Sequence, residues 1–123
     1  MPLWLPVASI VLGVLLALFG PRLARSSLVK VRWLWWPPRP LSRIGQWLFT
    51  FHSETSAVIL VTVGLSQLAP APFSQTLLIA CSLCFALHMV VGIFVTTPLL
   101  LFGVATVRPE EVPPRRPPSP HIM

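Results

Sequence analysis

Three long apolar runs constrain the fold of this chain more than any other feature of its sequence. The first extends from Leu3 to Phe19, the second from Ile44 to Leu68, and the third, which carries no charge, from Ser74 to Val107. A helix of about 20 residues crosses the apolar core of a bilayer. Charged residues make up 10% of the 123 residues, whereas a soluble domain averages about a quarter. We therefore expect an all-α integral membrane protein with three transmembrane helices.

The expected spans cover residues 3–20, 44–68 and 74–97 of one membrane domain, residues 1–107. Pro98 lacks a backbone donor and disfavours helix just before it, so the third span is expected to end near Thr96 and Thr97, with residues 99–107 forming a kinked extension or an interfacial segment. The first run also resembles a secretory signal core, but it lacks a basic n-region and a small-residue cleavage site, which favours a retained span. Residues 108–123 are rich in proline and are expected to form an extended tail.

All nine Lys and Arg residues fall on one side of the membrane in this arrangement. Six lie between the first and second runs and three follow the third, whereas the link SQLAPAPFSQ has none. The positive-inside rule then predicts an N-out, C-in orientation. The basic-aromatic segment LVKVRWLWWPPRP (residues 28–40) is expected to lie on the inner surface among lipid headgroups. Because this segment lies between two spans, we expect membrane lipids and no nucleic acid as its partners.

Few residues in the apolar runs can carry chemistry. The chain has no Asp, and Glu54 is the sole carboxylate in an expected span, so we expect no catalytic residue in this chain. Cys81 and Cys84 form a CxxC without a second pair to complete a zinc site, which favours simple packing. His52 and His88 remain as candidates, because ionisable residues inside a membrane are costly and usually functional.

The two histidines are predicted to lie at similar depth on antiparallel helices, about 12 and 13 Å from the inner ends of their spans. Residues at three- and four-residue steps on the third span make one stripe of small, weakly polar side chains around the histidine: Cys81, Cys84, His88, Gly92 and Thr96. Three roles stay open for the histidines: interhelical hydrogen bonding, ligation of haem or chlorophyll, and a proton relay that pairs His52 with Glu54 and with groups of a partner.

The second span is expected to have distinct faces. One face carries His52, Thr55 and Ser56. Glu54 points nearly the opposite way. Ser53 and Ala57 have the small-xxx-small spacing that allows close helix contact.

The segments FHSETSAVILVTVGL, LAPAP and LLIACSLCFALHMVVGIFVTTP, preceded by RPLS, resemble the small membrane-anchor subunits of succinate dehydrogenase (respiratory complex II). The resemblance covers residues 39–98. In that family, a first core helix opens on His and Ser or Thr residues. A short Pro-containing turn and a second core helix with a haem-ligating His follow, and a Gly comes four residues after that His, as His88 and Gly92 do here.

The resemblance implies that His88 is an axial ligand of haem b and that a second anchor chain supplies the other ligand. It also implies a ubiquinone pocket beneath a peripheral iron–sulfur subunit, in the mitochondrial inner membrane or the bacterial plasma membrane. The side chains that would border the pocket carry hydrogen-bond donors for quinone carbonyls: Arg43, Trp47, His52 and Ser53. The alternative is a cofactor-free structural subunit of a respiratory, photosynthetic or cation-antiporter complex, in which the basic-aromatic segment and the tail hold partners.

Overall fold

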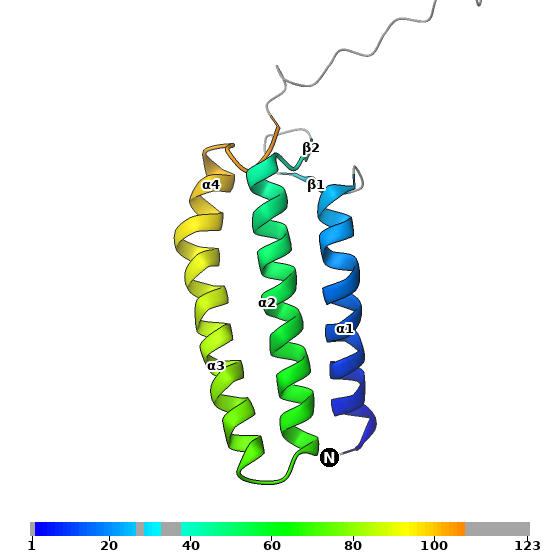
Figure 1. Ribbon diagram of the computed structural model, residues 1–123. Coiled ribbons are helices and arrows are strands. Elements are labelled where there is room, and N and C mark those ends of the chain that lie inside the picture. The colour runs from blue at the N-terminus through cyan, green and yellow to red at the C-terminus, as the bar shows by residue number, and fades with distance from the viewer. Residues whose placement is uncertain (1, 27–28, 33–37, 108–123) are drawn as a thin grey trace, which may run out of the picture.

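The computed structural model describes residues 2–26, 29–32 and 38–107. Three long helical rods lie side by side with alternating direction (Figure 1). Helix α1 is Trp4–Arg25 and α2 is Arg43–Leu68. Helix α3, Phe73–Val91, continues through a π-helical segment η1, Gly92–Thr96, into the short α4, Thr97–Leu101. Two short strands, β1 (Lys30–Val31) and β2 (Arg39–Pro40), pair antiparallel between α1 and α2.

All three rods are long and apolar enough to cross a membrane, which confirms the expected number of apolar helices. They cover Trp4–Arg25, Arg43–Leu68 and Phe73–Leu101. The N-out, C-in orientation stays a prediction. The prediction for the basic-aromatic segment lies partly outside the described residues, because residues 33–37 are not described, and the prediction for the tail, 108–123, lies wholly outside them. The two strands were not expected from the sequence.

The predicted end of the third span was wrong, because the helix runs through Pro98 to Leu101. The π segment accommodates the proline. The backbone N–H of Thr97 reaches the carbonyl of Gly92, five residues back, and the Thr97 hydroxyl donates to the same oxygen at 2.8 Å. One extra residue in the turn before Pro98 gives room for a ring that would otherwise clash with the preceding carbonyls.

The helix ends after Leu101 in a Schellman motif. Gly103 has a positive φ of 74°, its N–H bonds the carbonyl of Leu100, and the N–H of Val104 bonds the carbonyl of Leu99. Glycine suits this left-handed position because it has no Cβ. The chain then turns back over the start of α2, so residues 99–107 form the last turn of the third rod and a returning segment, and an interfacial position for them stays a prediction.

The returning segment is held against the first turn of α2. Ser42 caps that helix by accepting from the Gly45 N–H at 3.2 Å, and its hydroxyl donates to the Val104 carbonyl at 2.7 Å. The Ser42 N–H bonds the Ala105 carbonyl at 3.0 Å, and Ala105 is 1% exposed. A Cβ at Gly45 would lie 1.9 Å from the Ala105 oxygen, so this approach requires glycine. The segment that follows the third rod is therefore hydrogen-bonded to, and packed against, the start of α2.

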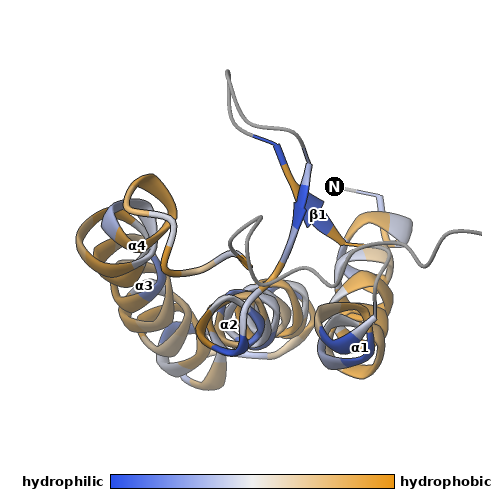
Figure 2. Cartoon of the chain, turned by 90° about the horizontal axis from the view of Figure 1, so that it is seen from above, coloured by the Kyte–Doolittle hydropathy of each residue, from blue (hydrophilic) through white to orange (hydrophobic). Residues whose placement is uncertain are grey.

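The three rods stand in a row with α2 in the middle (Figures 1 and 2). Helix α2 packs against α1 on one side and α3 on the other. Large apolar side chains cover the remaining surface of α1 and α3, including Leu18, Leu83 and Phe94. Such an apolar surface is suited to contact with lipid or with another protein, and not to contact with water.

Small residues bring α1 and α2 together. A Cβ at Gly20 would lie 2.5 Å from the Ser53 Cβ, and a Cβ at Gly13 would lie 2.9 Å from the Ala57 carbonyl oxygen. Ser53 is 6% exposed and Ala57 is buried as well. The predicted close contact through Ser53 and Ala57 is confirmed, and its partner is α1.

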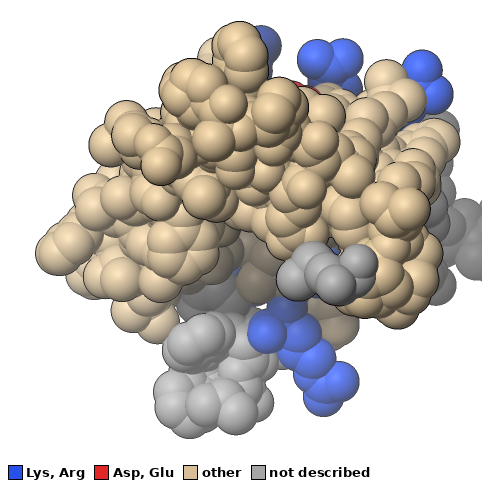
Figure 3. Space-filling model, turned by 90° about the horizontal axis from the view of Figure 1, so that it is seen from below, with Lys and Arg blue, Asp and Glu red and all other residues tan. Residues whose placement is uncertain are grey.

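Basic residues gather at one end of the row. All the described Lys and Arg side chains belong to the end of α1, the strand pair with its flanking residues, or the start of α2. Seen from the opposite end, where α2 meets α3, the near surface consists of other residue types, and Lys and Arg atoms are visible only beyond its outline (Figure 3). We call the basic end the arginine end.

Candidate functional site

His52 of α2 and His88 of α3 meet between the two helices, as their predicted depths implied. Their Nδ1 atoms lie 3.5 Å apart, and the rings are edge to face with centroids separated by 4.6 Å. Both side chains are half-buried. The two imidazoles therefore form one polar cluster inside an otherwise apolar helix pair.

Thr55 fixes the orientation of the His88 ring. Its Oγ1 lies 2.5 Å from His88 Nδ1 and 2.9 Å from the Phe51 carbonyl oxygen. A carbonyl can only accept, so a threonine hydroxyl that donates to Phe51 accepts the hydrogen of His88 Nδ1. The neutral imidazole then carries its lone pair on Nε2. No described residue hydrogen-bonds His88 Nε2, and this atom is not enclosed.

Thr96 holds the other histidine. Its hydroxyl lies 2.6 Å from His52 Nε2, which ties α2 to the π segment. Beyond this contact lies an apolar hollow of about 140 Å³. Its lining comes from the strand pair, α2, the end of the third rod and the returning segment: Val31, Leu41, Gly45, Leu48, Phe49, His52, Thr96, Leu100 and Ala105. His52 and Thr96 are the polar side chains of this hollow.

The small-residue stripe of the third rod faces α2. Cys81 and Cys84 are free thiols whose sulfurs lie 3.8 Å from the Ile59 carbonyl and 3.6 Å from the Thr55 carbonyl. Both contacts are weak hydrogen bonds that bring the helices together, in agreement with a packing role. A Cβ at Gly92 would meet a single atom within 4 Å, Cε1 of His52 at 3.5 Å. The small residue at position 92 therefore lies next to the His52 ring of α2 at ordinary van der Waals distance.

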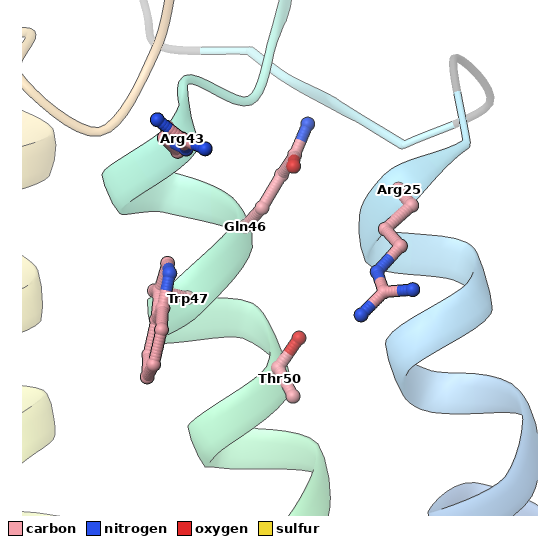
Figure 4. A pocket seen from close by; sticks show the side chains of 5 residues that line it. All are labelled: Arg25, Arg43, Gln46, Trp47 and Thr50. Carbon is pink, nitrogen blue, oxygen red and sulfur yellow. The ribbon is translucent and has the colours of Figure 1, made fainter.

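Arg43, Trp47 and Ser53 do not join the histidine cluster. Arg43 and Trp47 line a groove at the arginine end together with Arg25, Gln46 and Thr50 (Figure 4). Ser53 is buried against Gly20 of α1. Four side chains were expected to border a quinone pocket. The structure places the three other than His52 away from that histidine.

Glu54 lies on the other side of α2 from the histidines. It is exposed and lines a hollow of about 330 Å³ along the α1–α2 seam, and no described residue forms an ion pair or hydrogen bond with it. The remaining lining residues are small or apolar, apart from one threonine: Gly13, Ala17, Ala57, Val58, Val61 and Thr62. The structure does not bring Glu54 and His52 together as a proton relay within this chain.

The sequence-based search missed Arg25, Gln46 and Thr50 as site residues. They meet because α1 ends and α2 begins at the same end of the row. The charge of Arg25 was visible in the sequence, but which faces of two helices pair is set by small residues scattered along both. The small residues Gly20 and Ser53 indicate which faces of the two helices pack together. Recognising that pairing in the sequence would have located this groove.

Comparisons of the chain with protein-family models, with curated proteins and with solved structures find no match.

Proposed function

We propose that this chain is a non-catalytic membrane subunit of an electron-transfer complex, similar to the anchors of succinate:ubiquinone oxidoreductase, in which His88 is an axial ligand of haem b. The observation that carries the proposal is the Thr55–His88 hydrogen bond at 2.5 Å. Histidines that bind metals donate one ring N–H to a neighbouring acceptor and use the other nitrogen as the ligand. Thr55 is such an acceptor, and it leaves Nε2 of His88 for iron.

A residue without a side chain follows His88 at the level where a flat macrocycle would approach the third rod. Gly92 lies one turn later, and the one atom near its Cβ position is Cε1 of His52 at 3.5 Å. The described residues contain no group of three or more His, Cys, Asp or Glu that could hold a metal ion, and a haem needs only one imidazole from each of two chains. The chemistry that bound haem b supplies is one-electron transfer. A second anchor chain would contribute the opposite ligand.

We further propose that a quinone binds in the hollow next to His52. The hollow beyond its ring is apolar, and the Thr96 hydroxyl at its wall, which accepts from His52, retains its own hydrogen for a carbonyl oxygen. The hollow lies towards the arginine end, where a peripheral iron–sulfur subunit would dock if the basic residues face the inner side. The membrane would be the mitochondrial inner membrane or a bacterial plasma membrane.

The spectrum of the complex purified through a tag on this chain tests the haem proposal. We expect a b-type signal in the reduced-minus-oxidised difference spectrum, its loss in His88→Ala, and its retention in His52→Ala. Native gels must show that the His88→Ala complex still assembles. A b-type signal that persists in assembled His88→Ala would overturn the ligand assignment.

A second candidate is a cofactor-free structural subunit, and a separate observation favours it. His88 and His52 each hydrogen-bond a threonine of the neighbouring helix without any ligand. Such bonds are sufficient to stabilise a helix pair in a membrane. A wild-type complex that assembles with stoichiometric partners and contains no haem would support this role.

A further inference from the structure

The groove at the arginine end is lined entirely by side chains that can donate hydrogen bonds. Its five lining residues are Arg25 from the last turn of α1 and, from the first turns of α2, Arg43, Gln46, Trp47 and Thr50. Figure 4 shows Arg25, Gln46 and Thr50 in the space between the two helices, with Arg43 and Trp47 beside them on α2. The groove has a volume of about 420 Å³ and is open to the surface.

Among the residues that the structure describes, none neutralises the two guanidinium groups. No described residue forms an ion pair with Arg25 or Arg43. The one described carboxylate, Glu54, lies one turn deeper on α2 and lines a different hollow. Two guanidinium groups on facing helices repel each other unless an anion lies between them. The arrangement therefore favours a ligand that is negatively charged and rich in acceptors.

A phosphate meets both requirements. Guanidinium groups bind phosphate through parallel N–H···O bonds, and the Trp47 N–H, the Thr50 O–H and the Gln46 amide can donate to further oxygens. A quinone is also an acceptor, but it is uncharged and gains little from two cations. The charge of the groove thus distinguishes it from the apolar hollow next to His52.

The position of the groove indicates that the phosphate belongs to a lipid. From Arg43 to Thr50 the helix rises by about 10 Å, which spans the headgroup layer of a bilayer if α2 crosses it. Trp47 is 76% exposed, as is common for indole rings at this level.

The hollow beside Glu54 lies on the same α1–α2 seam, one helical turn beyond the groove. Residues 50, 54, 57, 58 and 61 of α2 recur at helical spacing on one face, and Gly13 and Ala17 leave space opposite them. We name this hollow the seam furrow. On α2 it extends from Glu54 to Thr62, about 12 Å of helix, which is long enough to hold the upper part of one acyl chain.

We propose that this site binds one anionic phospholipid, with its phosphate between Arg25 and Arg43 and an acyl chain in the seam furrow. The site is independent of haem and quinone, and the proposal does not require the chain to belong to an electron-transfer complex.

Titration of the purified full-length chain in a neutral detergent, followed by native mass spectrometry, tests the headgroup. The probes are phosphatidylglycerol, phosphatidylcholine and inorganic phosphate. We expect phosphatidylglycerol to bind at least 10-fold more tightly than phosphatidylcholine, and Arg25→Gln/Arg43→Gln to remove this preference. The matched control, Arg22→Gln/Arg32→Gln, removes the same charge from exposed sites outside the groove and should change affinity less than twofold.

Three results would overturn the headgroup assignment. Equal losses in the groove and control variants would mean that net charge, rather than a site, attracts the lipid. Full competition by millimolar inorganic phosphate would assign the groove to a soluble anion. If the Gln variant does not fold, Arg25→Lys/Arg43→Lys keeps both charges, and an unchanged preference in that variant would exclude recognition through the guanidinium fork.

The acyl chain is tested separately with Ala17→Leu, which fills the seam furrow. We expect this variant to bind long-chain phosphatidylglycerol at least fivefold more weakly, while dihexanoyl phosphatidylglycerol, whose chains are too short to occupy the furrow, binds as to the wild type. Unchanged long-chain binding would remove the furrow from the proposal.

Discussion

The hydroxyl of Thr55 lies 2.5 Å from Nδ1 of His88, and this contact joins α2 to α3 at the same level as the His52–His88 ring contact. The same hydroxyl lies 2.9 Å from the Phe51 carbonyl, and when it donates to that oxygen it acts on His88 as an acceptor. The tautomer of His88 therefore depends on a residue of another helix.

The two histidines should hold their hydrogens on different nitrogens. In bilayers at a pH where both are neutral, ¹⁵N spectra of histidine-labelled protein should show His88 protonated on Nδ1 and His52 on Nε2, where it donates to Thr96. Thr55→Val should remove the preference of His88 and leave that of His52. Protonation of His88 on Nε2 alone would show that the Thr55 hydroxyl donates to His88 Nδ1 instead of to the Phe51 carbonyl.

Loss of the Thr55 hydroxyl should destabilise the helix pair. Thr55→Val leaves the half-buried His88 Nδ1 without its partner, and we expect the free energy of unfolding to fall by about 0.5–2 kcal/mol. Thr55→Ser should retain most of the stability. Thr62→Val is a matched control, because the Thr62 hydroxyl bonds only carbonyls of its own helix, Val58 and Ile59. Steric-trap unfolding in bicelles gives these values, and a loss in the control equal to that in Thr55→Val would assign the effect to α2 alone.

Gly20→Ala should separate α1 from α2. The new Cβ would lie 2.5 Å from the Ser53 Cβ, so the helices must move apart, at a cost of about 1–3 kcal/mol. Ser53→Gly should recover part of the loss when it is combined with Gly20→Ala, and a double-mutant cycle measures this coupling. Additive effects of the two substitutions would show that the two positions are not in contact in the membrane.

Glu54→Leu should ease the insertion of α2. The carboxylate is exposed and lacks a partner among the described residues, and a charged side chain near the middle of a span costs about 2–3 kcal/mol on translocon scales. A glycosylation-mapping assay of the isolated α2 segment should show a higher inserted fraction for Glu54→Leu and a smaller gain for Glu54→Gln. No gain with Leu would mean that this level of α2 is not in the apolar layer.

The apolar helices and the depth of the histidines were predictable, because both follow from counts along the chain. Span length depends on hydropathy and a fixed rise per residue, and the His52–His88 contact follows from antiparallel helices that start at the same surface. These quantities need no knowledge of which helix faces meet.

Three features were not predictable in the same way: the continuation of the helix through Pro98, the packing of Ser53 against α1, and the groove at the arginine end. The π turn is stabilised by contacts distant in sequence, such as Thr96 with His52 and the returning segment with Ser42. A small-xxx-small spacing at Ser53 indicates a close neighbour but not which helix supplies it. The haem, quinone and partner assignments came from the resemblance and stay predictions.

The row of three rods also determines how unevenly substitutions will be tolerated. Helix α2 has a neighbour on both sides, whereas α1 and α3 each contact α2 along one side (Figure 2). A saturation scan of the isolated chain should therefore find two sensitive stripes on α2, one through His52 and Thr55 and the other through Ser53 and Ala57. It should find a single stripe on each outer helix. Any additional sensitive stripe that appears only when the scan is repeated in native membranes would mark the surface that a partner covers.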